Sequence, residues 1–219
     1  MRKWFLALVL AAALLGAGCG QMGQKDTAPQ TVSRPAVQSA ERQFAALTGG
    51  ETVAVFDTSA GVFKAVLYPD LAPQACDNFI GLVNKGFYNG LTITRVEKDF
   101  VVSAGQGVDG KGTTIWGGSR YPAEYTNSLH HYSGALCTRQ DQMTAAGYRP
   151  EVIAAYQAAG GAPYLDYGDT VFGQICEGME VVDRIAQSAV DEKQIPVEPI
   201  TINSVSLVSY EVPAASPAQ

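Results

Sequence analysis

The sequence predicts a mainly β domain capped by two or three helices, and three patterns support this fold class. Apolar and polar residues alternate over 52–56 and 62–68, on either side of a turn at 58–61, which is typical of a β-hairpin. A last strand is expected over 200–208. Helical signals are confined to a few segments, so the domain as a whole favours a closed β architecture.

Two of the three predicted helices have a recognisable start. Asp70 with Pro73 three residues later marks the first, and Gly86 ends it after an apolar face. An Ala-rich stretch after Pro150 predicts a second helix, and residues 179–187 predict another with apolar side chains on one side.

The N-terminus predicts export and anchoring to a membrane. Arg2 and Lys3 precede an apolar run over 4–15, and small residues lead to Cys19. This pattern is typical of a signal peptide, residues 1–18, cleaved before a lipidated Cys19; ordinary secretion with a nearby cleavage is the alternative. We expect residues 19–50 to be a flexible tether, residues 51–210 the domain, and residues 211–219 a disordered tail. The protein would then sit on the extracytoplasmic face of the cell membrane.

Charge and cysteine content narrow the function classes. The net charge is −6 and basic clusters are absent from the sequence, so nucleic acid is not an expected partner. Besides Cys19, the chain has Cys76, Cys137 and Cys176, which allow at most one disulfide. Cys137 and Cys176 fall in predicted strands that could be neighbours, whereas Cys76 is expected to be a buried thiol.

Competing chemical motifs have weak support. Residues 105–110 fit G-x-G-x-x-G, but the following residues do not begin a helix, which nucleotide binding requires. His130 and His131 are adjacent, so on a strand their side chains would face opposite ways and would not share a metal. We therefore expect solvated or structural histidines, no metal and no cofactor.

One segment carries a family resemblance. In residues 91–105, Arg95-Val96 is followed five residues after the arginine by Phe100 and then by an apolar strand that ends at Gly105. This stretch resembles the central motif of cyclophilin-type peptidyl-prolyl isomerases. Residues 63–82 resemble the first strand and helix of that family, and three segments, 164–166, 170–175 and 177–185, resemble its later motifs in order. The resemblance implies a closed β-barrel capped by helices.

The resemblance also implies a reaction and a site. It assigns catalysis to Arg95 and substrate binding to Phe100, Ser103, Tyr164 and Leu165. The implied activity is cis-trans isomerisation of X-Pro bonds, which would assist the folding of exported proteins. Proline-containing polypeptides are the implied partners. An arginine suits this chemistry because it is permanently charged and its donors are rigidly placed.

The sequence departs from the family pattern at several pocket positions. Thr94 stands where the family has His, Ser103 where it has Gln, Tyr164 where it has Trp, and Asp169 where it has His. A Gln-Phe-Phe strand that binds peptide in the family has no counterpart after Arg139. Two alternatives therefore stay open.

In the first alternative, Arg95 merely pairs with Glu97 or Asp99 on a solvated strand edge. In the second, the chain is a non-catalytic binding lipoprotein that uses the same pocket for a proline-containing segment or an envelope partner.

Overall fold

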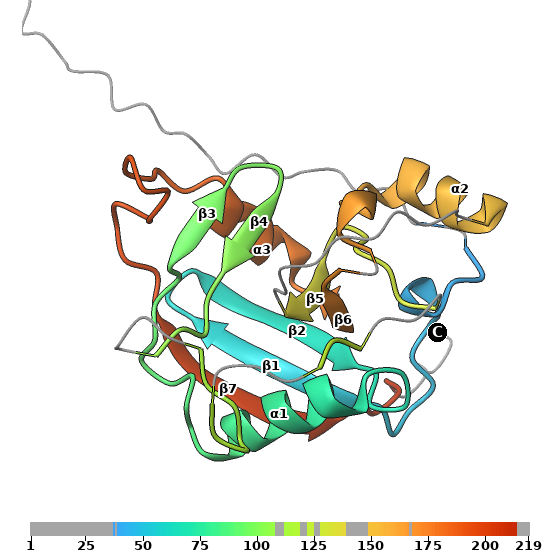
Figure 1. Cartoon of the computed structure of the whole chain (residues 1–219), viewed down its shortest axis with the longest axis horizontal. Coiled ribbons are helices and arrows are strands. Elements are labelled where there is room, and N and C mark those ends of the chain that lie inside the picture. The colour runs from blue at the N-terminus through green and yellow to red at the C-terminus, as the bar shows by residue number, and fades with distance from the viewer. Residues whose placement is uncertain are drawn as a thin grey trace, which may run out of the picture.

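The structure is a computed structural model that describes residue 37 and residues 39–107, 112–118, 122–124, 128–138, 149–166 and 168–213. Its strands form a five-stranded antiparallel sheet in the order β5-β6-β2-β1-β7 and a separate pair, β3-β4 (Figure 1). Three α-helices accompany the strands within the described residues, so the predicted mainly β class is confirmed. No helix within the described ranges is long and apolar enough to cross a bilayer. The predicted signal peptide and Cys19 lie outside these ranges.

The predicted hairpin is confirmed and lies at the centre of the large sheet. Strands β1 (Thr52–Thr58) and β2 (Gly61–Leu67) pair antiparallel, with Thr58 opposite Gly61 at the turn. Gly61 has a φ of +129°, which a residue without Cβ adopts most easily. On the outer sides, β7 (Ile202–Ser209) pairs with β1 and β6 (Thr170–Glu177) pairs with β2. Strand β5 (Ala135–Thr138) extends the sheet beyond β6.

Helix α1 (Pro73–Asn84) covers one face of this sheet (Figure 1). It begins at the predicted proline, and its first free backbone N–H groups, those of Gln74 and Ala75, donate to the carboxylate of Glu124 at 3.0 and 2.8 Å. A carboxylate there satisfies orphan donors and complements the helix dipole. Asp70, by contrast, pairs with Arg42 rather than with the helix end.

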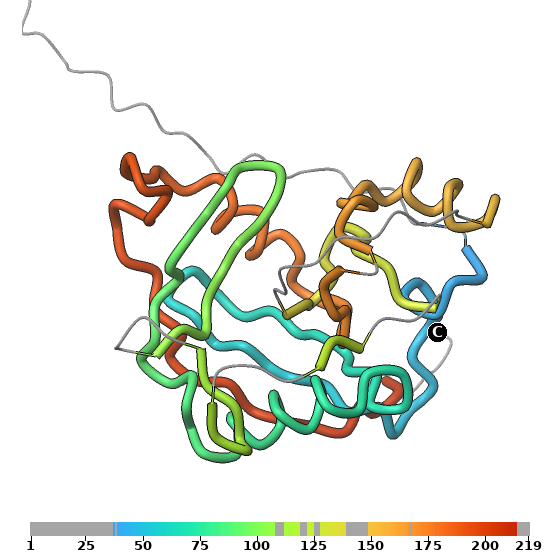
Figure 2. Tube along the Cα trace, in the orientation of Figure 1, coloured from blue at the N-terminus to red at the C-terminus, as the bar shows by residue number. Residues whose placement is uncertain are grey.

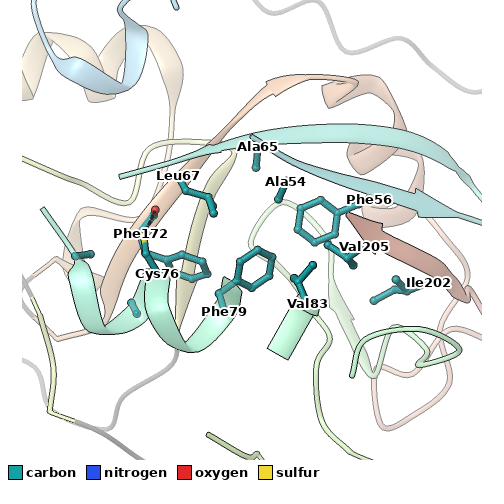
Figure 3. Close-up of a cluster of buried hydrophobic side chains, with 12 residues drawn as sticks. Ala54, Phe56, Ala65, Leu67, Cys76, Phe79, Val83, Phe172, Ile202 and Val205 are labelled. Carbon is teal, nitrogen blue, oxygen red and sulfur yellow. Dashed lines mark hydrogen bonds between the residues drawn. The ribbon is translucent and has the colours of Figure 1, made fainter. Parts of the chain in front are cut away.

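The main core lies between α1 and the sheet (Figure 3). Phe79 of α1 packs its ring 5.5 Å from that of Phe172 in β6 and 5.9 Å from that of Phe56 in β1. Cys76, on the same helix face, is completely buried. Small side chains at Ala54 and Ala65 in the sheet, also buried, leave room for these rings.

The strand pair β3 (Arg95–Glu97) and β4 (Val101–Ser103) packs against α3 (Met179–Ala186). Val96 is 2% exposed and shares a cluster with Val181 and Ile185 on one side of α3. This is the apolar helix face that the sequence predicted over 179–187. The pair lies beside α3, on the side away from α1 (Figure 1).

The expected closed barrel is not formed by the described strands, because β3-β4 and the five-stranded sheet remain separate. Backbone hydrogen bonds nevertheless join them on one side. Gly90 N–H donates to Ile202 at 2.8 Å, Ile202 N–H donates to Leu91 at 2.8 Å, and Ile93 N–H donates to Ile200 at 2.9 Å. The segment before β3 therefore runs alongside the start of β7.

The N-terminal segment packs on the domain before residue 51. A short 3-10 turn, η1 (Arg42–Phe44), lies beside α2 (Pro150–Ala159), the helix predicted after Pro150 (Figure 2). Gln43 is 6% exposed and donates to the His130 carbonyl and the Gln174 side chain, both at 2.9 Å. The folded part of the chain thus includes residues that the sequence analysis assigned to the flexible tether.

The three described cysteines are free thiols. Cys137 and Cys176 do lie on the neighbouring strands β5 and β6, as expected. Cys137, however, is opposite Val171, five residues before Cys176 along β6. At roughly 3.3 Å per residue, that offset is too long for a disulfide, which needs Cα atoms within about 7 Å.

Candidate active site

The strand pair β3-β4 places Arg95 on the face turned away from α3. Arg95 is directly opposite Ser103, and Val96 is directly opposite Val102. Successive side chains of a strand point to opposite faces, and directly opposed residues share a face. Because Val96 is buried against α3, Arg95 and Ser103 share the other face. The predicted catalytic residue and one predicted substrate-binding residue are therefore neighbours.

Two acceptors hold the guanidinium of Arg95. Its Nε donates to the side-chain oxygen of Gln194 at 2.8 Å, and its Nη2 pairs with the carboxylate of Glu97. The side chains of Arg95 and Glu97 are 34% and 38% exposed. The pairing alternative raised from the sequence is thus observed for Glu97. A pair this exposed contributes about 0–1 kcal/mol, and it uses one of the five guanidinium donors.

Phe100 and Tyr164 come together from distant segments. Phe100 ends the turn between β3 and β4, just after Asp99, whose φ is +60°. Tyr164 lies in the 3-10 turn η2 (Pro163–Leu165). The two ring centroids are 6.0 Å apart, and the side chains are 41% and 56% exposed. Leu165, beside Tyr164, is partly buried. An open aromatic pair of this kind offers flat apolar faces to a ligand.

The structure therefore arranges the predicted residues on one hairpin and one turn. Arg95 lies opposite Ser103 in the β3-β4 pair, and a ring contact joins Phe100 of the same hairpin to Tyr164 of η2. Leu165 follows Tyr164 in η2. Cys19, the predicted lipidation residue, lies outside the described residues.

A buried polar network lies directly behind Tyr164 and Leu165. Asp166 is 3% exposed, and its carboxylate accepts hydrogen bonds from Nδ1 of both His130 and His131 at 2.7 Å. It also accepts from the backbone N–H of His131 at 2.8 Å and from the Tyr156 hydroxyl at 2.7 Å. Since an ionised carboxylate can only accept, both Nδ1 atoms are protonated.

Hydrogen bonding decides the charge state of this carboxylate. Burial alone would raise the pKa of Asp166, but the bonds from His130, His131 and Tyr156 outweigh burial and lower it well below its usual value. The ionised carboxylate thus ties α2 and the histidine segment to the end of η2.

The two histidines do not face opposite ways as expected for a regular strand, because residues 129–131 are not strand. Both rings are buried and share Asp166, so their role is structural, as one of the expectations held. Within the described ranges, no group of three or more His, Cys, Asp or Glu residues is arranged to hold a metal ion.

A cavity of about 340 Å³ opens elsewhere, between η1 and the start of α2. Its lining includes Glu41, Arg42, Arg149 and Glu151. Charged walls of both signs do not suit a proline ring, which favours apolar contacts. We therefore place the candidate site at the β3-β4 hairpin and η2.

Two residues of the site were missed by sequence reasoning. Gln194 lies 99 positions after Arg95, and an isolated glutamine in a polar loop carries no motif. Asp166 was part of the Tyr-Leu-Asp match, but its partners His130 and His131 were judged separately. A search for a carboxylate that could pair with adjacent histidines would have suggested Asp166 with His130 and His131. No sequence signal indicated Gln194.

Comparisons with known proteins bear on the identity of this arrangement. A family model described as "Cyclophilin type peptidyl-prolyl cis-trans isomerase/CLD" matches residues 53–207. A Staphylococcus saprophyticus protein named "Putative peptidyl-prolyl cis-trans isomerase" is 30% identical over 189 residues, covering 74% of this chain and 94% of that protein. The protein of the same name from Staphylococcus aureus strain COL is 28% identical over 185 residues, covering 72% and 92%.

Solved structures give the same fold. A crystal structure of a Cryptosporidium parvum cyclophilin type peptidyl-prolyl cis-trans isomerase is similar, with a TM-score of 0.58 and 22% identity over 74% of this chain and 99% of that chain. Its structure in the presence of the dipeptide Ala-Pro has a TM-score of 0.57 at 22% identity, over 74% and 100%. These likenesses concern the fold alone, whereas the family model and the Staphylococcus saprophyticus relative extend to the sequence. The chain belongs to the cyclophilin-type peptidyl-prolyl cis-trans isomerase family.

Proposed function

We propose that this chain isomerises X-Pro peptide bonds in exported polypeptides, with Arg95 as the catalytic donor. Rotation about a peptide bond must overcome a barrier of about 18–20 kcal/mol, because it breaks amide resonance. The uncatalysed step takes tens of seconds or more. Metal ions and nucleophiles are not required, since no covalent bond is made or broken.

Arg95 can donate the hydrogen bond that lowers this barrier. As the bond twists, the lone pair of the prolyl nitrogen localises, and a guanidinium N–H donated to that nitrogen stabilises the twisted state more than either planar state. Its Nε and Nη2 are occupied by Gln194 and Glu97. Among the described residues Nη1 has no acceptor, so its donors are available to a substrate.

The aromatic pair completes the proposed site. Phe100 and Tyr164 remain substantially exposed although their rings are in contact, so a proline ring can pack on them without moving core residues. Leu165 adds an apolar wall, and Ser103 is placed beside Arg95 to contact the peptide backbone. The observation that carries the proposal is that one hairpin presents both Arg95 and Phe100, and that Phe100 is in ring contact with Tyr164 of η2.

We also infer that the sheet curls into a closed barrel. The hydrogen bonds of residues 90–93 with residues 200–202 support this, because they add the β3 segment to the β7 edge. A continuous order β5-β6-β2-β1-β7-β3-β4 needs only contact between β4 and β5 to close. Closure would bring the β4 side of the candidate site toward Leu136 and its neighbours.

Export and anchoring are a separate part of the proposal and rest on the N-terminal sequence. We propose that residues 1–18 are removed and that Cys19 carries lipid, which holds the domain at the extracytoplasmic face of the membrane. A polar segment between Cys19 and η1 would let the site reach newly exported chains.

A refolding assay tests the activity. The soluble chain of residues 20–219, which contains every described residue, is added to a protein whose refolding is limited by an X-Pro bond. We expect acceleration that falls about 10²-fold or more in Arg95→Ala, the typical effect of removing one preorganised donor. Lys98→Ala is the matched control, because Lys98 is an exposed cation of the same hairpin. A folded wild-type chain without any acceleration would favour the non-catalytic binding alternative.

A further inference from the structure

We propose that Gln194 is a positioning residue that fixes the guanidinium of Arg95 for catalysis. This inference rests on the proposed isomerase function and adds a residue from the loop after α3 to the site. Three features of the loop carry it: a side-chain hydrogen bond, a backbone hydrogen bond to the adjacent residue, and an unusual backbone angle.

Gln194 contacts β3 twice. Its side-chain oxygen accepts from Nε of Arg95 at 2.8 Å, and its backbone carbonyl accepts from the N–H of Val96 at 2.8 Å. The backbone bond lies on the edge of β3 that β4 does not occupy. Because the two bonds reach consecutive residues, they fix the position of the loop along β3. The side-chain amide of Gln194 therefore lies next to Arg95.

The backbone of Gln194 is in the left-handed region, with φ at +64°. This conformation is unfavourable for a residue with a Cβ, and glycine would adopt it at no steric cost. Gln194 and Asp99 are the two non-glycine residues of this kind among those described, and both flank β3. A glutamine at a position suited to glycine indicates that its side chain has a function that offsets the backbone strain.

Hydrogen bonds within the loop fix the backbone from which the Gln194 side chain extends. Asp191 accepts from the backbone N–H groups of Lys193 and Ile195 at 2.8 and 2.9 Å, and its carbonyl accepts from Gln194 N–H at 3.0 Å. Val197 N–H closes the loop on Ala189 at 2.9 Å. An acceptor that starts from a fixed backbone loses less conformational entropy when substrate binds than one on a mobile loop would.

Two fixed points orient a planar group. With Glu97 alone, the guanidinium of Arg95 could swing about its Nη2 contact, since that pair is more than one-third exposed on the Glu97 side. The additional bond from Nε to Gln194 fixes the plane, and neither of these two bonds uses Nη1. Correct orientation of a catalytic donor affects the transition state more than substrate binding.

The test compares variants in residues 20–219. Gln194→Met removes the acceptor at similar length, and Gln194→Glu retains an acceptor oxygen. Gln194→Gly removes the side chain while relieving the positive φ. Gln187→Met is the matched control, because Gln187 is exposed at the end of α3. We expect kcat to fall about tenfold in the Met and Gly variants with KM unchanged, while the Glu variant and the control stay within about twofold of wild type.

A readout independent of activity accompanies the kinetics. The Nε–H resonance of Arg95, identified by its loss in Arg95→Lys, is followed by ¹⁵N NMR. We expect slow hydrogen exchange in wild type and Gln194→Glu, and faster exchange in Gln194→Met and Gln194→Gly at unchanged urea midpoints. Unchanged exchange in the last two variants, or unchanged kcat in an active enzyme, would overturn the proposal. A folded but inactive wild type would refute the proposed function instead, and the exchange rates alone would then decide whether Gln194 orients Arg95.

Discussion

Replacing Asp166 by alanine is expected to remove a large part of the stability of the domain. The carboxylate is 3% exposed and serves three donors of buried residues, namely Nδ1 of His130 and the Nδ1 and backbone N–H of His131. Each buried donor left without a partner costs about 1–3 kcal/mol. Three such donors would cost about 3–9 kcal/mol together, and allowing for partial relaxation we expect the free energy of unfolding to fall by about 3–5 kcal/mol.

Urea unfolding measures this loss. With a slope of about 2 kcal/mol per molar for a domain of this size, the midpoint should move down by about 2 M. Asp77→Ala is the matched control, because Asp77 is exposed on α1, and it should change stability by no more than about 0.5 kcal/mol. Asp166→Asn, which keeps the shape and one acceptor oxygen, should lose less than Asp166→Ala.

The loss should also depend on pH in a defined direction. The folded pKa of Asp166 is lowered from its ordinary value of 3.8, so its contribution to stability is fully present above that value and is lost as pH falls below it. The difference between wild type and Asp166→Ala should therefore shrink as the pH falls below about 4. A loss under about 1 kcal/mol at pH 7, or one that grows in acid, would refute the reasoning.

Further outcomes concern the backbone, the thiols and one exposed carboxylate. Gly178→Ala should lower the free energy of unfolding by at least about 2 kcal/mol, because φ there is +77° and a Cβ would lie 2.6 Å from the Val62 carbonyl oxygen. A thiol reagent should modify the exposed Cys176 first, whereas Cys76 should react only on unfolding, since burial raises its pKa to about 12. The pKa of Glu51, lowered to about 2 by hydrogen bonds from the 48–49 turn, should be visible in a ¹³C carboxyl titration.

Each of these outcomes has its own control. Gly90→Ala introduces a Cβ at a φ of +80° with no neighbouring atom within 4 Å, so an equal loss in both glycine variants would mean that the close approach at Gly178 is irrelevant. Rapid labelling of Cys76 in the native protein would contradict its burial in the main core. A titration midpoint near the ordinary 4.5 for Glu51 would show that its hydrogen bonds do not persist in solution.

Local signals made much of the fold predictable. The β1-β2 hairpin follows from alternation on both sides of a four-residue turn, and α1 begins at Pro73 as the sequence indicated. The α3 face against β3 was also visible as an apolar stripe. Such features depend on residues close together in the chain, so their physical causes can be read without tertiary contacts.

Contacts between distant segments were not predictable in the same way. Glu124 caps α1 from about 50 residues away, and Gln194 reaches Arg95 across 99 residues. The two histidines share Asp166 because their segment leaves the strand geometry that adjacent side chains would otherwise obey. In each case a single polar side chain satisfies a donor elsewhere, and nothing in its own sequence neighbourhood marks it.

The site itself was partly predictable. The family resemblance named Arg95, Phe100 and Tyr164, and the ring contact between the last two agrees with a shared surface. It did not reveal that Arg95 is already engaged by Glu97 and Gln194, because the resemblance concerns which residues are present and not what surrounds them.

The most direct test of the central claim is exchange NMR on a short X-Pro peptide mixed with residues 20–219. One experiment then reports both binding and the rate of interconversion between the cis and trans forms. We predict exchange within milliseconds to seconds for wild type, and in Arg95→Ala a loss of exchange with peptide binding retained. Peptide binding by wild type without faster exchange, or undiminished exchange in Arg95→Ala, would contradict the assignment of Arg95 as the catalytic donor.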